Sequence, residues 1–465
     1  MTPIAPPKRK HSHWLLGDLK DFQEQPLEML LDIADNYGSV TQLRIAHVPQ
    51  IVITHPDGAR HVLQQNNRNY LQEQSFIDVV RTALLSGNNL LSSDGNEWLR
   101  RRRLMQPAFH HKIVAQFGDL ITAETERMLA TWHSGEPIEV EQAMMDVTMS
   151  IISRTMLSQN ILDDHPQLYH AFTTAFNTII SRATTITGGM IPLFLPTAKN
   201  RAYKKALALI HDILSDIVRE RQTQAVTERP HDLLTMLMAA EDKESGIKLS
   251  FKQIIDDIFD MVTAGYESSA ITLACLFHAL AQNPEAEAKL HAELDAVLNG
   301  RPPTIADLPQ LPYLQQVVNE TMRRYPAIYM NVRQSIKDDE VLGYRIPANS
   351  IVIINIYGLH HHTDYWSQPL SFSPERFAAQ NENQITKFTF LPFANGPRKC
   401  IGEPLARLQI ALTVATIAQR VRLRLDPTRQ AKLIALFSLR AKDGIFLIPS
   451  PRGSGVTPHL RPPRR

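Results

Sequence analysis

Cys400 lies in the segment NGPRKCIG, between two glycines and after two cationic residues, Arg398 and Lys399. The residues from Glu403 on predict a helix, so the sulfur would lie at a helix N-terminus, where free amides and the helix dipole favour negative charge. The glycines allow turns that bring backbone amides close to the sulfur. The segment therefore predicts a thiol with a depressed pKa that persists as a thiolate.

Such a thiolate can serve as a nucleophile, a redox thiol or a metal ligand. A nucleophile needs a histidine base, whose spatial position a sequence does not show. A redox thiol needs a second cysteine, and Cys275 is remote in the sequence. An axial thiolate ligand of haem iron needs no further protein ligand. The remaining alternative is a structural cysteine beside a turn, and the residues alone leave these choices open.

The segment AGYESSA, residues 264–270, interrupts a strongly helical pattern with a glycine. A glycine inside a helix costs about 1 kcal/mol relative to alanine. An acid and two hydroxyl residues follow, and a serine that bonds back to the previous turn would widen the helix. We therefore expect a local bulge; the alternative is that Ser268 and Ser269 are helix-packing residues.

Glu320 and Arg323 are three residues apart in NETMRRYP, which makes them neighbours on one face of a predicted helix. The apolar residues of this segment form a stripe on another face. Periodicity alone therefore predicts a solvent-exposed ion pair.

A mainly α fold with a small β portion must position these residues. A capping box at Ser250 begins a long helix that continues to Asn283. Residues 39–56 predict a hairpin, residues 332–358 a small sheet, and LRAKDGIFLIP a second hairpin near the C-terminus. No repeat or linker divides the chain. We expect one large domain over residues 1–450 and a basic, disordered tail over 451–465.

Composition excludes several classes of protein. The formal net charge of +2 over 465 residues indicates neither a nucleic-acid nor a membrane partner. Two cysteines rule out a disulfide framework and a four-cysteine metal site, and the consecutive histidines 360–362 do not share one face, so we assign no zinc. The longest apolar run, AITLACLFHALA, is shorter than the roughly 20 residues that span a bilayer. We expect a soluble, cytoplasmic protein.

Five residues of the cysteine segment match F-x-x-G-x-R-x-C-x-G, which resembles the haem-ligand signature of the cytochrome P450 superfamily: Phe393, Gly396, Arg398, Cys400 and Gly402. Further signatures of this superfamily follow along nearly the whole chain. The resemblance implies the P450 fold, haem b as cofactor and Cys400 as the proximal iron ligand. It also implies a monooxygenase that inserts one oxygen atom from O2 into an organic substrate.

The resemblance also assigns roles to the other motifs. It implies that Glu320 and Arg323 are buried and joined by Arg376 of the PERF segment in a structural triad that supports the cysteine loop. AGYESS resembles the oxygen-activation motif, in which Glu267 and Ser268 would pass protons. Serine at position 268 stands where threonine is usual, so we expect poorer coupling of electrons to product.

The cofactor and substrate contacts follow from the same resemblance. The residues expected to bind the haem and its propionates are Trp98, Arg102, Arg333, Phe393, Arg398 and Cys400. The residues expected to line the substrate pocket are Phe76, Val79, Ile328, Tyr329 and Phe437. Because this lining is apolar, we expect an apolar substrate such as a fatty acid, a terpenoid or a polyketide-like molecule.

The chain carries no nucleotide-binding motif of its own. The resemblance implies that electrons from NAD(P)H arrive through a ferredoxin or flavodoxin with its reductase. The alternatives are a peroxide-using peroxygenase or isomerase that needs no reductase, and a non-enzymatic haem-binding sensor. The acid–hydroxyl pair in AGYESS argues against both.

Overall fold

The computed structural model describes residues 3–10, 13–74, 89–184, 192–244, 246–436 and 438–452. Its α-helices are α1 (Leu19–Glu24), α2 (Pro26–Asn36), α3 (Pro56–Arg60), α5 (Gly95–Met105), α6 (His111–Val114), α7 (Gly118–Leu129), α8 (Val140–Leu157), α9 (Ile161–Asp164), α10 (Pro166–Thr184), α12 (Ala198–Thr223), α13 (Leu233–Ala239), α14 (Phe251–Gln282), α15 (Pro284–Leu298), α16 (Pro312–Arg324), α17 (Ile356–His361) and α18 (Glu403–Ala418). Its strands are β1 (Val40–Ile45), β2 (Val48–Ile53), β3 (Tyr70–Leu71), β4 (Ile138–Glu139), β5 (Asn331–Ser335), β6 (Asp339–Val341), β7 (Tyr344–Ile346), β8 (Ile351–Ile354), β9 (Val421–Leu425), β10 (Leu433–Ala435), β11 (Leu439–Ala441) and β12 (Phe446–Pro451). The expected mainly α fold with a minor β portion is confirmed.

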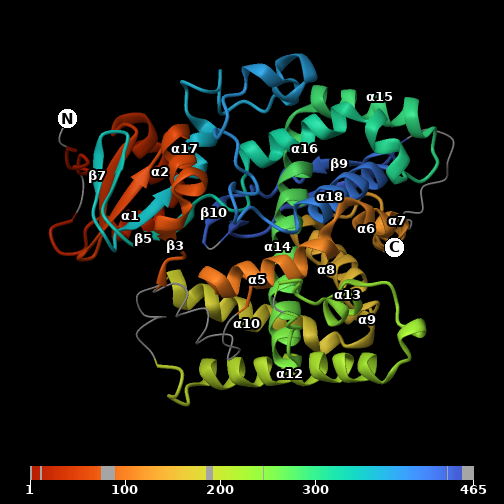
Figure 1. Cartoon of the computed structure of the whole chain (residues 1–465). Coiled ribbons are helices and arrows are strands. Elements are labelled where there is room, and N and C mark those ends of the chain that lie inside the picture. Colours follow the sequence, from red (N-terminus) through yellow and green to blue (C-terminus); the bar gives the residue numbers. More distant parts are fainter. Residues whose placement is uncertain are drawn as a thin grey trace.

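Helix α14 crosses the centre of the molecule (Figure 1). It begins with the expected capping box, in which Ser250 accepts from the Gln253 amide and the Gln253 side chain accepts from the Ser250 amide. Asn283 and Pro284 end it and open α15, as expected. Helices α8, α16 and α18 pack against α14, and their apolar residues form the largest core cluster. Helix α14 is therefore the central element of the helical core, against which α8, α16 and α18 pack.

The predicted N-terminal hairpin is present as β1 and β2. It joins β8 and β5 in one five-stranded sheet with the order β1-β2-β8-β5-β3. Because side chains alternate along β2, Val52 packs with Leu30 and Ile33 of α2, whereas Ile51 and Ile53 pack on the opposite face. Figure 1 shows this sheet at one side of the molecule, next to the helical part.

The hairpin predicted for LRAKDGIFLIP is wrong. Strand β11 pairs with β10, whereas β12 pairs with β9 and β4. The four residues between β11 and β12 turn the chain from one small sheet into another, with Gly444 at a positive φ of 80°. Alternation along each strand was visible in the sequence, but the partner of each strand was not.

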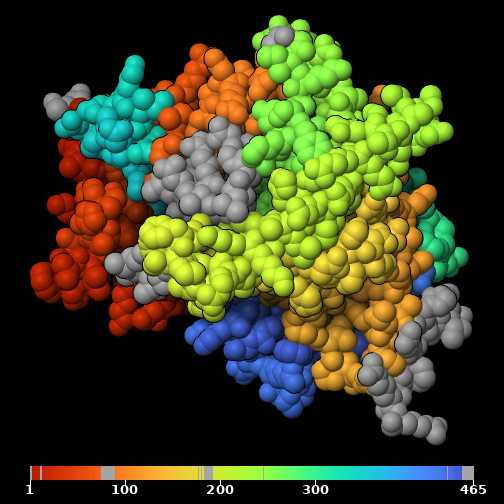
Figure 2. All heavy atoms as spheres, turned by 90° about the horizontal axis from the view of Figure 1, so that it is seen from below, coloured from red at the N-terminus to blue at the C-terminus, as the bar shows by residue number. Residues whose placement is uncertain are grey.

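Helices α10 and α12 pack against each other, and α12 extends across the face seen in Figure 2. In the part of the chain that the structure describes, no helix combines the length and the apolar composition needed to cross a bilayer. The tail expected over residues 451–465 falls almost entirely outside the described ranges.

Candidate active site

The cysteine loop is held against the N-terminal part of the chain by a glycine. Gly396 has a φ of +76°, and a Cβ atom at this position would lie 1.8 Å from the carbonyl oxygen of Leu63. The Cys400 amide donates to the Phe393 carbonyl oxygen over 3.0 Å, and Gly402 is the N-cap of α18. The loop therefore has a backbone path that a side chain at position 396 would block.

This geometry gives a first prediction. Gly396→Ala should destabilise the protein by about 3 kcal/mol or more, because the added Cβ overlaps backbone and the left-handed φ strains alanine. The measurement is the free energy of unfolding by urea. Gly402→Ala is the matched control, since Gly402 has a φ of −80° and its added Cβ would meet only the Cys400 sulfur at 3.9 Å. Equal stability losses in the two variants would contradict the prediction.

The sulfur of Cys400 has a mixed electrostatic environment. Burial is the largest effect and raises the pKa of the thiol, whereas the amides of Gly402 and Glu403 and the charge of Arg102 lower it. The expectation of a depressed pKa is therefore wrong for the polypeptide alone, because desolvation outweighs the helix N-terminus. Cys400 is nevertheless accessible. A cation bound at this sulfur would stabilise the thiolate.

Three arginines converge near this loop from separate elements. Arg102 of α5 donates to the Lys399 carbonyl oxygen over 2.8 Å. Arg398 stacks on the Trp98 ring with 4.5 Å between guanidinium carbon and ring centroid, and it pairs with Asp94. The structure thus brings Trp98, Arg102 and Arg398 together where α5 meets the cysteine loop.

Arg333 of β5 completes this cationic group. Its side chain is buried and donates to Gln72 Oε1 over 2.8 Å. Burial and the neighbouring charge of Arg398 lower the pKa of Arg333 to about 10. Among the described residues, neither Arg333 nor Arg102 forms an ion pair with a carboxylate, and a buried cation without a counter-ion is costly. The group therefore has an excess of positive charge that suits an anionic ligand.

The structure brings Glu320, Arg323 and Arg376 together. Arg323 binds both carboxylate oxygens of Glu320 at 2.7 and 2.8 Å, and both side chains are fully buried. Arg376 approaches Glu320 Oε1 at 3.4 Å from the short helix Pro374–Phe377. The prediction of a solvent-exposed Glu320–Arg323 pair, which rested on periodicity alone, is thus wrong.

His360, in α17, is a structural residue at this junction. Its Nε2 accepts from the Leu391 amide over 2.8 Å, and its ring is fully buried. His360 thereby connects α17 to the segment that leads into the cysteine loop. Within the described ranges no group of three or more His, Cys, Asp and Glu side chains is arranged to hold a metal ion.

Helix α14 is continuous through the segment AGYESSA, and the expected bulge is not observed. Gly265 instead permits close packing of α8, because an added Cβ would lie 3.0 Å from Ile152. Thr148 of α8 also donates to the Tyr266 carbonyl oxygen over 2.9 Å. The Ser268 hydroxyl bonds back to the Ala264 carbonyl oxygen over 2.9 Å, as anticipated for a serine in a helix.

Glu267 and Ser268 point to different partners. The buried carboxylate of Glu267 accepts from Ser438 Oγ and from Arg440 Nε, both over 2.9 Å. Burial raises the pKa of Glu267, and the charge of Arg440 opposes this effect. Arg440 and Ser438 were missed in the sequence, where only the position of Arg440 among alternating residues of a predicted strand was visible.

The predicted pocket residues are only partly testable. Phe76, Val79 and Phe437 lie outside the described residues. Ile328 is half-buried. Tyr329 is a core residue, because its ring packs in the cluster between α2 and the sheet and its hydroxyl donates to the Leu436 carbonyl oxygen over 2.5 Å. The assignment of Tyr329 to an open pocket wall is therefore corrected.

Comparison with known protein families identifies the family to which the chain belongs. The cytochrome P450 family model matches residues 6–452. The chain belongs to the cytochrome P450 family. As a cytochrome P450 it is a haem-iron monooxygenase, and the resemblance seen in its motifs is confirmed.

Relatives and solved structures agree with this membership. The P450 is 32% identical over 414 residues to cyclooctat-9-en-7-ol 5-monooxygenase of Streptomyces melanosporofaciens, covering 89% of this chain and 88% of the relative. It is 29% identical over 426 residues to pentalenene oxygenase of Streptomyces avermitilis, covering 91% and 92%. The crystal structure of the cytochrome P450DA heme domain has a TM-score of 0.88 at 22% identity, covering 99% of this chain and 100% of that one.

The residues of this P450 fit a haem. An iron porphyrin carries two propionates, and the cationic group beside the cysteine loop contains Arg102 and Arg333, which have no carboxylate partner among the described residues. Haem also needs an axial ligand, and the Cys400 sulfur faces two backbone amides that can support a thiolate. The donor set and the excess charge therefore match this cofactor.

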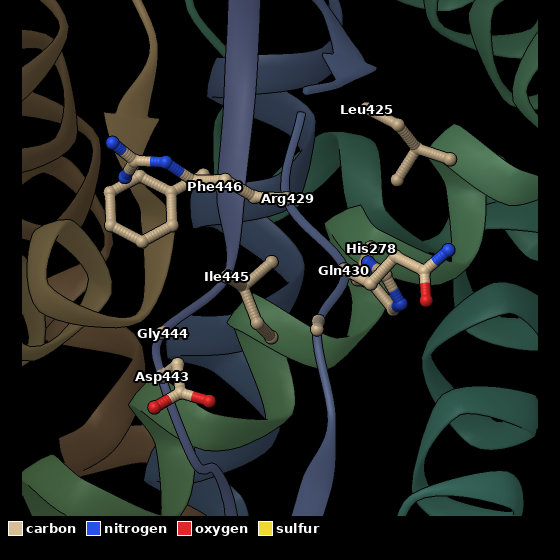
Figure 3. A pocket seen from close by; sticks show the side chains of 9 residues that line it. His278, Leu425, Arg429, Gln430, Asp443, Gly444, Ile445 and Phe446 are labelled. Carbon is tan, nitrogen blue, oxygen red and sulfur yellow. The ribbon is translucent and has the colours of Figure 1, made fainter. Parts of the chain in front are cut away.

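A pocket lies away from the residues expected to hold the haem. It has a volume of about 240 Å³ and lies beside the C-terminal half of α14, where Figure 3 shows His278, Gln430 and Asp443 around it. None of the predicted site residues lines it. This pocket is therefore separate from the residues expected to hold the haem.

Proposed function

We propose that this P450 hydroxylates a cyclic terpenoid, with electrons delivered from NAD(P)H by a ferredoxin or flavodoxin and its reductase. The observation that carries the substrate class is the likeness over nine-tenths of the chain to two relatives, whose names specify a cyclic alkenol and pentalenene. Fatty acids and polyketide-like molecules are the other apolar classes that the sequence favours. The terpenoid is preferred because these two relatives are 32% and 29% identical to this chain, whereas a fatty-acid omega-hydroxylase that also matches it is 26% identical.

We infer that the haem is held by Cys400 as the iron ligand and by Trp98, Arg102, Arg333 and Arg398 around its propionates, with Phe393 on the cysteine side. Stacking on Trp98 fixes the plane of the Arg398 guanidinium, which can bind a carboxylate through two hydrogen bonds. The Arg407 guanidinium lies 5.0 Å from the Phe393 ring centroid, which fixes this ring beside the loop. When bound, the haem supplies the iron that activates dioxygen, with electron donation from the thiolate.

The chain's own contribution to turnover would be to deliver protons along α14. In our proposal the Ser268 hydroxyl leaves its bond to the Ala264 carbonyl oxygen and donates a proton on the open face of α14, and Glu267 gives a proton to Ser268 in turn. Glu267 is held by Arg440 and Ser438, so it must exchange part of this contact before it reaches Ser268. Burial raises the pKa of Glu267, which favours the protonated carboxyl that a proton donor needs, while the charge of Arg440 opposes this effect.

Residue 268 allows a direct test of this relay. Ser268→Thr should decrease the fraction of electrons lost as hydrogen peroxide by about twofold or more, because the β-methyl group restricts the hydroxyl to fewer rotamers. Ser268→Ala, which removes the hydroxyl, should increase that fraction. The measurement is peroxide formed per NAD(P)H consumed at saturating substrate. A threonine variant that leaks as much as the wild type, or more, would contradict the relay.

The proposed function is tested by binding and then by turnover. The ferric, haem-loaded enzyme is titrated with terpenes, fatty acids, steroids and macrolides, and the Soret band reports entry of a molecule beside the iron. We expect a shift with terpenoids, followed by hydroxylated product with a ferredoxin or flavodoxin system. A shift with fatty acids alone would refute the terpenoid assignment. If product formed in the assay with peroxide but in no assay with an electron-donor system, the redox-partner assignment would be refuted.

A further inference from the structure

Asp260 lies on α14, one turn before Ala264 and two turns before Ser268. Residues four apart in a helix share a face, so the three side chains follow one another along it. This face is open although the helix is mostly buried, because Ala264 is exposed and Ser268 and Asp260 are partly accessible. The adjoining residues Phe259 and Met261 are buried. Asp260 therefore lies on the same open face of α14 as Ala264 and Ser268.

The surroundings of Asp260 are those of an internal wall. Burial and the charge of Asp257 raise its pKa to about 7, while hydrogen bonding from the Leu91 backbone and the charge of Arg101 lower it in part. A carboxyl on the outer surface would be hydrated and would keep its ordinary pKa. Asp260 is partly accessible on a face of α14 where Ala264 is exposed, so its carboxyl can accept a hydrogen bond from a ligand that lies against this face.

The charged side chains near Asp260 are bonded to other partners, which leaves its carboxyl able to accept a hydrogen bond from a ligand. Arg101 lies close to Asp260, but its Nη1 donates to Asp257 Oδ2 over 2.7 Å, and Asp257 also accepts from the Leu90 amide over 3.1 Å. Asp256, one turn earlier, is bonded to Lys252 over 2.9 Å. The structure thus gives each of the two neighbouring acids a cationic side chain, while Asp260 lies on the open face of α14.

We propose that Asp260 determines specificity by accepting a hydrogen bond from a hydroxyl group already present on the substrate. This inference rests on the proposed function and narrows its substrate class to an oxygenated terpenoid. Asp260 and Ser268 are eight residues apart, or about 12 Å along the helix. The existing hydroxyl would therefore lie remote from the carbon that is oxidised. A reaction that installs a hydroxyl on the hydrocarbon skeleton must precede this one.

The test compares matched ligands that differ by one hydroxyl. Cedrol and cedrane, and 1-dodecanol and dodecane, are titrated into the haem-loaded enzyme, and Kd is obtained from the Soret shift and from calorimetry. For at least one pair, we expect the wild type to bind the alcohol about tenfold more tightly than the hydrocarbon, as for a hydrogen bond to a charged or strongly polar acceptor. In Asp260→Leu this preference should disappear, while hydrocarbon binding changes less than twofold.

Two variants complete the design. Asp260→Asn keeps the shape and an acceptor oxygen and should retain part of the preference for the alcohol. Asp256→Asn removes the acid bonded to Lys252 and should leave the preference unchanged. The proposal is overturned if wild type does not prefer the alcohol in either pair, or if Asp260→Leu weakens alcohol and hydrocarbon equally. Equal binding within a pair would leave the terpenoid assignment intact, whereas a complete lack of binding by every ligand would overturn both.

Discussion

Cys400→Ser should abolish monooxygenase activity and the absorbance of the reduced, carbon monoxide-bound form that is characteristic of thiolate-ligated haem. A serine oxygen is a much poorer donor to iron than a thiolate, so the electronic contribution of the axial ligand would be lost. The fold should remain, because Cys400 is accessible and the backbone hydrogen bond of its amide to Phe393 does not depend on the side chain.

The matched control is Cys275→Ala, which removes the buried sulfur from the core of α14. This variant should lose some stability through the small cavity that forms but keep the thiolate spectrum. If Cys400→Ser kept this spectrum, or if Cys275→Ala lost it, Cys400 would not be the iron ligand. Circular dichroism of both variants distinguishes a lost ligand from a lost fold.

Arg323→Ala should have the second large effect, a loss of about 3–5 kcal/mol in the free energy of unfolding, as for breaking a buried ion pair. It would leave the fully buried Glu320 with only the longer contact to Arg376 and the Ser373 amide. It would also free the carbonyl oxygens of His360 and Pro369, which Arg323 binds over 2.7 and 2.9 Å. We expect expression without haem, measured as the ratio of Soret to protein absorbance.

Arg324→Ala is the control for this prediction. Arg324 follows directly in the chain, and its guanidinium donates to the Leu370 carbonyl oxygen in an exposed contact. Its removal should cost about 1 kcal/mol or less. A similar loss of haem in both variants would show that the end of α16, and not the triad, sets cofactor retention.

The fate of Glu320 and Arg323 illustrates what a sequence can predict. Periodicity located their helix and their shared face, and it placed that face in solvent because charged residues are seldom buried. The partners that make burial affordable, Arg376 and carbonyl oxygens of residues 360–371, come from segments 37 to 56 residues later in the chain. Only the family resemblance carried this information. The local sequence pattern therefore predicted the helix, whereas contacts with distant segments determine that Glu320 and Arg323 are buried.

Glu267 and Asp260 show the same limit within the site. The motif identified Glu267, but its partner Arg440 is 173 residues away, in a strand whose pairing the sequence did not reveal. Asp260 matched no motif and was missed. A signal was nevertheless present, because an acid one turn before Ala264 lies on the same face as the motif. Desolvation distinguishes it from an ordinary helix acid, and only the folded arrangement shows it.

The five-stranded sheet has a consequence for synthesis of the chain on the ribosome. Strand β2 pairs in parallel with β8, with Gln50 opposite Ile351, so its second partner emerges about 300 residues later. At roughly 5–20 residues per second, the N-terminal hairpin waits about 15–60 s with one edge unpaired. An unpaired edge of this kind is a template for pairing with another chain. We expect newly made protein to depend on chaperones, and slower translation of residues 54–350 to decrease the soluble yield.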